Sequence, residues 1–187
     1  MNLHHFSSQR IFLRRCEEMD ADLLYALEND PQIDRTNTLV EPLALFEARQ
    51  ITSARESELL SNGFLLLVVC LRQSEMQGEN IPIGIAQLYD FNFFHRRSAV
   101  GIVLKGEYQH RGYGEKVLHM LINYAFKALS LHQVYAEIYP TNIAAKACFS
   151  KVGFQKVATL PQWYKMDDGY QDLEIHTITK KVFYNEH

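Results

Sequence analysis

The stretch that decides the fold is "YQHRGYGEKVLHMLINYAF", at residues 108–126, which places two glycines directly before a strongly apolar segment. In that segment Val117, Leu121 and Tyr124 recur at the spacing of one helical face, which predicts a helix over about 114–129 that packs against a sheet. The first turn of such a helix carries unpaired backbone N–H groups and a partial positive charge. Because Gly112 and Gly114 let phosphate oxygens approach those groups, the stretch favours an anion-binding turn.

Two common phosphate-binding motifs do not match this stretch. No Lys-Ser or Lys-Thr pair follows the second glycine, so it is not the lysine-bearing P-loop. Leu118 stands where a dinucleotide fingerprint expects a third small residue. Short glycine motifs are common, so taken alone this one also fits an ordinary turn between a strand and a helix.

Composition narrows the class of protein. The chain has 187 residues, of which 47% are hydrophobic, so we expect a single domain over 1–187 with its core at about 10–180. Its 22 acidic and 19 basic side chains lack the basic surplus of a nucleic-acid-binding protein. The longest apolar run, at 64–71, is far shorter than the roughly 20 residues of a membrane helix. Three cysteines without metal-ligand spacing, and no apolar leader, predict a cytoplasmic protein with reduced thiols and no metal.

The remaining patterns predict a mixed α/β (α+β) sheet protein. We expect strands at 10–15, 64–72, 81–92, 98–104 and 132–140, and two more strands around the turn Asp167-Asp168-Gly169. Helices are expected at 19–30, with Asp20 or Asp22 as cap, at 41–63, and at 142–152, where Gly153 ends the helix. The apolar side of the second helix is predicted to include Leu43, Phe46, Ile51, Ala54 and Leu59.

Two motifs together resemble a known family. "QHRGYG" at 109–114 resembles the Gln/Arg-x-x-Gly-x-Gly/Ala loop of the GNAT superfamily of acetyl-CoA-dependent N-acetyltransferases, and it follows a predicted strand, as in that family. "YPTNIAAKACFSKVGF" at 139–154 resembles the family's next element, at the right separation. The resemblance spans about 10–180 and implies a single-domain GNAT fold with a mixed central sheet flanked by helices. Within the superfamily, 93–114 is most similar to spermidine N-acetyltransferases, and next to ribosomal-protein N-terminal acetyltransferases.

The resemblance also implies a binding site for acetyl-CoA, or coenzyme A, as co-substrate. Strand backbone for the pantetheine arm would come from Ile102, Val103 and Leu104. The pyrophosphate loop would comprise Gln109, His110, Arg111, Gly112, Tyr113, Gly114 and Glu115. The opposite side, where two strands splay apart, would carry Asn142, Ala145, Lys146 and Phe149. Asn142 fits a plain helix cap as well.

The chemistry is harder to assign. A Lys-like amine has a pKa of about 10.4, so a base or a desolvating pocket is useful at neutral pH. Many relatives carry a Tyr four residues before the Gly of Gly-Phe, where this chain has Phe149. Spermidine-type relatives often carry a Glu early in the central strand, where this chain reads Ser98-Ala99-Val100. The catalytic residues are therefore unknown from sequence; the candidates, each of which also fits a structural role, are Tyr139, Glu137, Cys148 and His176.

The acceptor is expected to be a polyamine or another small primary amine. Acids that would attract a cation are Asp30, Asp34, Glu41, Asp167 and Asp168, and aromatic walls would come from Tyr89, Trp163 and Tyr164, although turn chemistry and core packing explain some of these. The cationic run at 95–97 fits the cofactor's 3′-phosphate, a protein partner or water. Three alternatives stay open: a protein N-terminal α-amine, whose pKa near 8 needs less help from a base, a catalytically weak coenzyme A sensor, and a nucleotide-binding module. A homodimer is common in the family.

Overall fold

The computed structural model describes residues 8, 10–31, 42–53, 63–73, 80–166 and 169–186. Within them, one sheet of seven strands has the order β1-β2-β3-β4-β5-β7-β6. The strands are β1 (Ile11–Arg15), β2 (Leu65–Leu71), β3 (Ile81–Asn92), β4 (Arg97–Leu104), β5 (Gln133–Ile138), β6 (Gln155–Met166) and β7 (Gly169–Thr179). The helices are α1 (Ala21–Glu28), α2 (Leu45–Ser53), α4 (Tyr113–Lys127), α5 (Ile143–Lys151), α6 (Lys180–Glu186) and the short 3-10 turns η2 (Glu18–Asp20) and η3 (Gly106–Tyr108).

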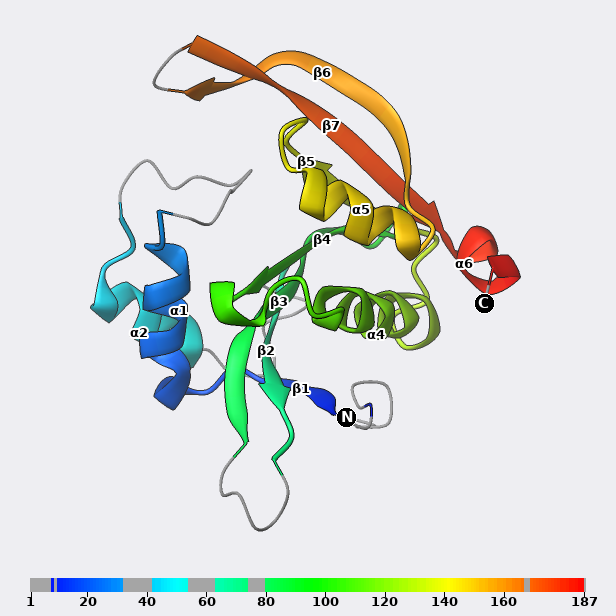
Figure 1. Ribbon diagram of the computed structural model, residues 1–187. Coiled ribbons are helices and arrows are strands. Elements are labelled where there is room, and N and C mark those ends of the chain that lie inside the picture. Colours follow the sequence, from blue (N-terminus) through cyan, green and yellow to red (C-terminus); the bar gives the residue numbers. More distant parts are fainter. Residues whose placement is uncertain are drawn as a thin grey trace.

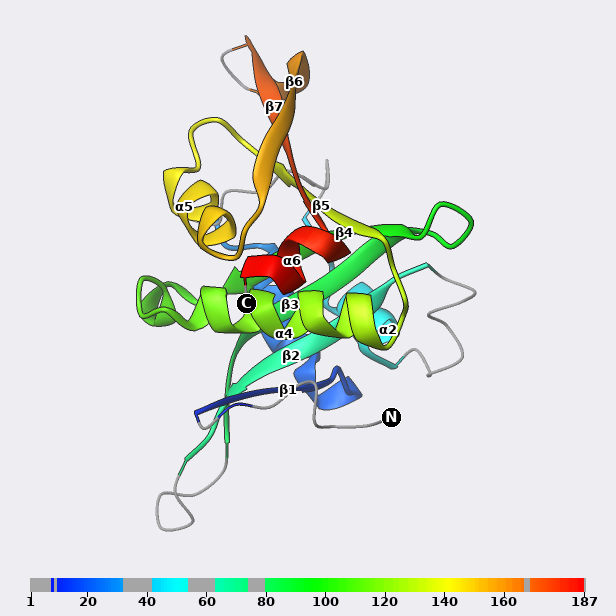
Figure 2. The ribbon, with the colours of Figure 1, turned by 90° about the vertical axis from the view of Figure 1, so that its right-hand side faces the viewer.

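Helices cover both faces of the sheet, with α1 and α2 on one face and α4 on the other (Figures 1 and 2). Successive side chains of a strand point to opposite faces. In β2, Val68 packs with the α1 and α2 side chains, whereas Leu67 and Val69 belong to the cluster under α4. A strand buried on both faces reads as a continuous apolar run, which explains residues 64–71.

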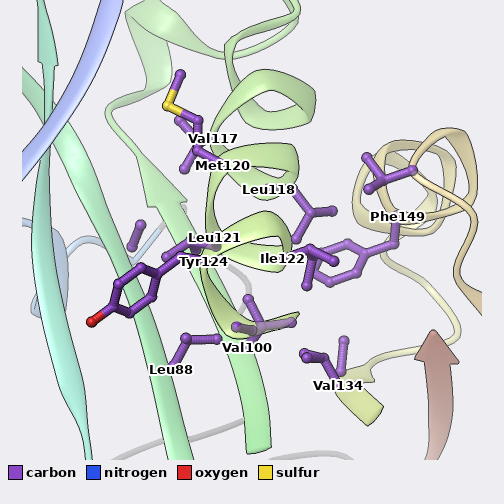
Figure 3. Packing of buried hydrophobic residues seen from close by; sticks show 14 of the residues in the cluster. Leu88, Val100, Val117, Leu118, Met120, Leu121, Ile122, Tyr124, Val134 and Phe149 are labelled. Carbon is purple, nitrogen blue, oxygen red and sulfur yellow. The ribbon is translucent and has the colours of Figure 1, made fainter. Parts of the chain in front are cut away.

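The amphipathic helix predicted from the opening stretch is α4. Its buried face includes Val117, Leu121 and Tyr124, which lie against side chains of the sheet such as Leu88 and Val100 (Figure 3). Burying a side chain of this size contributes about 1.5–3 kcal/mol relative to leaving it exposed. The helix is therefore anchored along its length, and its N-terminus is held in a fixed place.

The sheet opens at its only parallel pair among the described strands. β4 and β5 pair from Arg97 with Gln133 to Ala99 with Tyr135, and the ladder then stops although both strands continue. Beyond that point β4 stays on β3: a Cβ added to Gly84 would lie 2.3 Å from the Val103 carbonyl oxygen. β5 instead continues along β7. The two halves of the sheet therefore splay apart on the side where β4 ends.

Several sequence predictions need correction. The helix expected over 41–63 is described only as α2, and residues 54–62, with Ala54 and Leu59, lie outside the described part. Phe46 and Ile51 are 63% and 36% exposed, since α2 turns Ala48 and Thr52 inward instead. Asp20 is the N-cap of α1 but does not cap it with its side chain.

Two further differences come from tertiary contacts. The Asp20 carboxylate accepts hydrogen bonds from the Arg14 guanidinium, at 2.6 and 2.7 Å, and from the Glu17 N–H. Helix α6 was not predicted, and it packs through Phe183 on Phe126 of α4. Both contacts join segments whose proximity the local sequence pattern does not reveal.

Candidate active site

The loop that enters α4 has a backbone that only certain residues accept. Gly112 is the N-cap of α4 and has φ of +76°, in the left-handed region that favours glycine. His110 also has a positive φ, of +57°. The Gln109 side chain donates a hydrogen bond from Nε2 to the Leu104 carbonyl at 2.9 Å, which ties the loop to the end of β4. The first N–H groups of α4 thereby face the opening between β4 and α5.

Helix α5 approaches this loop from the other side. A Cβ added to Gly114 would lie 3.3 Å from the Cys148 Sγ, so the glycine allows α4 and α5 to come close. Asn142 is the N-cap of α5, and its Oδ1 accepts a hydrogen bond from the Ala145 N–H at 2.9 Å. The cap role expected for Asn142 is therefore present. Lys146 Nζ donates to the Pro140 carbonyl at 2.5 Å and lies 3.9 Å from Glu174 Oε1.

A cavity of about 530 Å³ lies between these elements. The predicted cofactor residues that line it are Ile102, Val103, Leu104, Gln109, His110, Gly112, Gly114, Glu115, Asn142, Ala145 and Phe149. The lining residues that sequence reasoning did not assign to the cofactor are Ala144, Ala147, Cys148 and Lys151. We call this space the cofactor cavity. Ala144, Ala147 and Cys148 lie on α5, so the spacing of small residues in this helix was a signal in the sequence for a cavity wall.

Three predicted cofactor residues are not among the residues that line it. The Arg111 guanidinium lies over the Tyr108 ring, 5.8 Å from its centroid. Tyr113 is half-buried and packs against the core. Lys146 is engaged with Pro140 and Glu174 as described.

The cofactor cavity fits an elongated pyrophosphate-containing molecule. Its walls include glycines of the loop and alanines of α5, which leave backbone groups accessible, and the N-terminus of α4 is an anion-binding end. The carboxylate in the wall, Glu115, lies 3.8 Å from Lys151 Nζ, which offsets its charge. Beyond Ala99, β4 has no ladder partner on the β5 side, so an extended arm has room to lie along Ile102–Leu104. These residues fit coenzyme A.

A second, smaller cavity of about 140 Å³ lies on the α1 side of the splay. We call it the acceptor cavity. It is lined by Glu28, Gln87, Tyr89, Val100, Gly101, Ile102, Val103, Glu137, Ile138, Tyr139, Asn142, Ala145 and Phe149. It shares Ile102, Val103, Asn142, Ala145 and Phe149 with the cofactor cavity. Two molecules, one in each cavity, would meet at these shared residues.

Glu137 is one of two half-buried carboxylates that line the acceptor cavity, and Glu28 is the other. It lies on β5, and its Oε2 accepts a hydrogen bond from the Tyr164 hydroxyl at 3.3 Å. Burial raises the pKa of Glu137, the Tyr164 hydrogen bond opposes that shift, and the nearby Asp90 charge adds to it. A carboxylate with a raised pKa is a stronger base than an ordinary one.

The tyrosines around Glu137 are held in their protonated form. Burial and the Glu137 charge raise the pKa of Tyr164 to about 12. The same two causes raise the pKa of Tyr89. Burial and a hydrogen bond to Asp90 raise the pKa of Tyr135. The acceptor side therefore combines carboxylates with neutral phenols.

The other catalytic candidates are placed as follows. Tyr139 is 2% exposed and lines the acceptor cavity, with its ring edge-on to Tyr164. Phe149 lines both cavities but carries no hydroxyl. Cys148 lines the cofactor cavity, and burial raises the pKa of its thiol. His176 lines neither cavity, and its Nε2 lies 2.9 Å from Glu174 Oε2.

Of the described residues expected on the substrate side, some lie at the acceptor cavity and some do not. Tyr89 lines the acceptor cavity and Tyr164 contacts Glu137 behind it. Trp163, expected as an aromatic wall, lines neither cavity, and it is not packed in the core either, because its side chain is 57% exposed. Asp30 and the exposed run at 95–97 line neither cavity, and Asp34, Glu41, Asp167 and Asp168 lie outside the described residues.

The described residues lack two further features, a cluster of metal ligands and a membrane-spanning helix. No three of their His, Cys, Asp and Glu side chains are grouped as metal ligands would be. None of the helices in that part of the chain is both long and apolar enough to cross a membrane.

Comparison with known proteins agrees with this geometry. Residues 10–155 match the family described as "Acetyltransferase (GNAT) domain". A spermidine N(1)-acetyltransferase of Vibrio cholerae is 22% identical over 178 residues, covering 95% of this chain and 98% of that protein. The spermidine N(1)-acetyltransferase of Escherichia coli K12 is 23% identical over 181 residues, covering 97% and 92%.

Among solved structures, the Vibrio cholerae spermidine N-acetyltransferase in complex with CoA and spermine superposes with a TM-score of 0.81 at 22% identity, covering 95% of this chain and all of that one (100%). The fold expected from the glycine loop and the Asn–Gly-Phe element is thereby confirmed. The family match covers most of the chain, including β4, the loop before α4, and α5. The chain therefore belongs to the acetyltransferase (GNAT) family, and it is an acyltransferase that takes its acetyl group from acetyl-CoA.

Proposed function

We propose that this enzyme acetylates a primary amine of the polyamine class, with Glu137 as the general base. The observation that carries the proposal is the character of the acceptor cavity. Its titratable lining side chains are Glu28, Glu137, Tyr89 and Tyr139, and no Lys or Arg is among its described lining residues. Such a lining favours a cation and offers aromatic faces to it. The spermidine acetyltransferases among the relatives support the same class.

In this proposal acetyl-CoA occupies the cofactor cavity. The backbone of Ile102–Leu104 would lie along the pantetheine arm, and the N–H groups at the start of α4 would meet the pyrophosphate. Gln109 would act by holding the loop to β4 rather than by charge. The acetyl carbonyl would then lie near the residues shared by the two cavities.

The protonated amine would first lose one proton to water, and Glu137 would then take a second proton from the nitrogen as that nitrogen bonds to the acetyl carbonyl carbon. The carbon–sulfur bond breaks, and its electron pair leaves on the sulfur as coenzyme A thiolate. An amine of pKa about 10.4 is neutral in only roughly one molecule in a few thousand at pH 7, so a nearby base is needed. The thiolate of a thiol with pKa about 8.5 leaves without a proton donor at modest cost. The reaction therefore does not require an acid at the position of Phe149.

The test is a measurement of coenzyme A release from acetyl-CoA with a thiol reagent. The amines would be spermidine, spermine, an aminoglycoside, free amino acids and peptides with free N-termini. We expect release that depends on spermidine or spermine. Preference for the peptides would replace the polyamine by a protein N-terminal α-amine.

A binding control separates a wrong amine from a silent protein. Acetyl-CoA should raise the melting temperature, because a ligand that binds only the folded state stabilises it. A raised melting temperature without release for any amine would contradict the proposal and favour a coenzyme A-binding sensor.

A further inference from the structure

Strand β6 carries a bulge beside the acceptor cavity. Leu160 pairs with Leu173 and Tyr164 pairs with Gln171. Between these two pairs β6 advances by four residues while β7 advances by two. Within the bulge Gln162 has φ of +52°, a conformation that is uncommon for a residue other than glycine. The Gln162 N–H donates to Asp172 Oδ1 of β7 at 2.8 Å. The bulge is therefore held by a specific contact across the hairpin.

The bulge decides which residue of β6 faces Glu137. Glu137 pairs with Ile175 on β7, and Gln171 lies four residues before Ile175, so both point to one face of the sheet. Tyr164, as the partner of Gln171, points to that face too. Without the two extra residues, Gln162 would oppose Gln171. Strand β6 curves over the sheet in this region (Figure 1).

Tyr164 makes two contacts on that face. Its hydroxyl donates to Glu137 Oε2 at 3.3 Å. Its ring meets the Tyr139 ring edge-on, with centroids 5.4 Å apart and an interplanar angle of 73°. Tyr164 itself lines neither cavity among the described lining residues. It therefore contacts Glu137 without lining the acceptor cavity itself.

We propose that the β6 bulge, held by Asp172, positions Tyr164 so that its hydroxyl fixes the Glu137 carboxylate in the acceptor cavity. This rests on the proposed function, in which Glu137 is the base. Tyr164 is a positioning residue, because it acts through Glu137. A hydrogen bond to the charged form of an acid favours that form and lowers its pKa, against the opposite effect of burial.

Other groups act on Glu137 as well, and the test must keep them constant. The titratable groups that face it are Glu28 from α1, Tyr89 and Asp90 from β3, Tyr135 and Tyr139 from β5, and Tyr164 from β6. Asp90 raises the cost of ionising Glu137 because like charges repel. The Tyr164 hydroxyl is the one of these with a hydrogen bond to Glu137 among the contacts described.

The first experiment follows the Glu137 carboxyl by carbon-13 NMR through a pH titration, with the signal assigned by its loss in Glu137→Gln. In Tyr164→Phe, which keeps the ring, we expect the Glu137 pKa to rise. Asp172→Ala should raise it in the same direction, whereas Asp172→Asn, whose Oδ1 still accepts from Gln162, should restore the wild-type titration. Tyr170→Phe, on the exposed end of the same hairpin, is the matched control and should change nothing. An identical Glu137 titration in wild type and Tyr164→Phe would overturn the proposal.

The second experiment measures kcat/KM for the preferred amine against pH. In Tyr164→Phe the acidic limb should move to higher pH, with a loss of about fivefold on that limb and near-wild-type values above it. In a Glu137→Gln background, Tyr164→Phe should have no further effect, because the hydroxyl acts through the carboxylate. An equal loss at every pH would contradict the positioning role. If no amine is acetylated, the proposed function fails, yet the NMR titration still decides whether Tyr164 tunes Glu137.

Discussion

The two cavities of this enzyme are built in different ways. The cofactor cavity is lined by residues of only two segments, 102–115 and 142–151, with glycines and alanines among them. The acceptor cavity draws side chains from α1, β3, β4, β5 and α5, at positions from Glu28 to Phe149. A molecule common to a whole family can be bound by a local motif. The partner that differs between members is recognised by side chains that only the fold brings together.

The substitution with the largest expected effect impairs the acceptor cavity and leaves the cofactor cavity intact. Glu137→Gln should lower kcat/KM for the amine by about 10²- to 10⁴-fold, the usual contribution of a general base. The Kd for acetyl-CoA, measured by calorimetry, should stay unchanged, because Glu137 does not line the cofactor cavity. Glu18→Gln, an exposed carboxylate on η2, is the control and should match wild type. A loss of acetyl-CoA affinity in Glu137→Gln would mean that the two cavities are not independent.

A second substitution should damage both cavities together. A Cβ at Gly84 would lie 2.3 Å from the Val103 carbonyl oxygen and 2.9 Å from Leu104 Cα, so β4 would have to move. We expect Gly84→Ala to cost about 1–3 kcal/mol of folding free energy, seen as a lower denaturation midpoint. The KM values for the amine and for acetyl-CoA should both rise.

Gly101→Ala is the matched control for Gly84→Ala. Its Cβ would lie 3.1 Å from Gln87 Nε2, the flexible end of a side chain, so the free-energy cost should be smaller. If Gly101→Ala destabilised the protein more than Gly84→Ala, the close approach of β3 to β4 would not be what opens the sheet.

A smaller effect should fall on the cofactor side alone. Gly112 has φ of +76°, where a side chain costs about 1–2 kcal/mol. Relief of that strain would turn the N–H groups of α4 away from the pyrophosphate, so Gly112→Ala should weaken acetyl-CoA binding about tenfold. Gly112→Asn should be milder because Asn tolerates this conformation. The KM for the amine at saturating acetyl-CoA should not change. A rise in that KM would contradict the independence of the cofactor and acceptor cavities.

The smallest effect is expected where the cavities meet. Phe149→Tyr adds a hydroxyl at a residue that both cavities share. Because the thiolate leaves unaided at modest cost, kcat at saturating substrates should rise by no more than about tenfold. A fall in kcat would show that the absence of an acid at this position is not what limits turnover.

The sequence by itself determined the local elements of this protein. Helix α4 followed from its apolar spacing, the doubly buried β2 from its continuous apolar run, and the cofactor loop from Gly112, Gly114 and Asn142. These features depend on neighbours within a few residues, where spacing, capping and backbone freedom act directly. The resemblance to the acetyltransferase family rested on the same local motifs, and the family match confirmed it.

Only the tertiary structure decided the acceptor side. Glu137 and Tyr164 are 27 residues apart, and they meet because of the β5–β7 register and the bulge in β6. Glu28 lines the same cavity from α1. Phe46, Ile51 and Trp163 are exposed although their side chains are apolar, which the sequence did not predict. A sheet register is set by pairing along whole strands, and a shift of one residue sends a side chain to the other face. Contacts made across strands therefore exist only once the sheet has formed, whereas the conformation of the glycine loop depends on residues that are adjacent in the sequence.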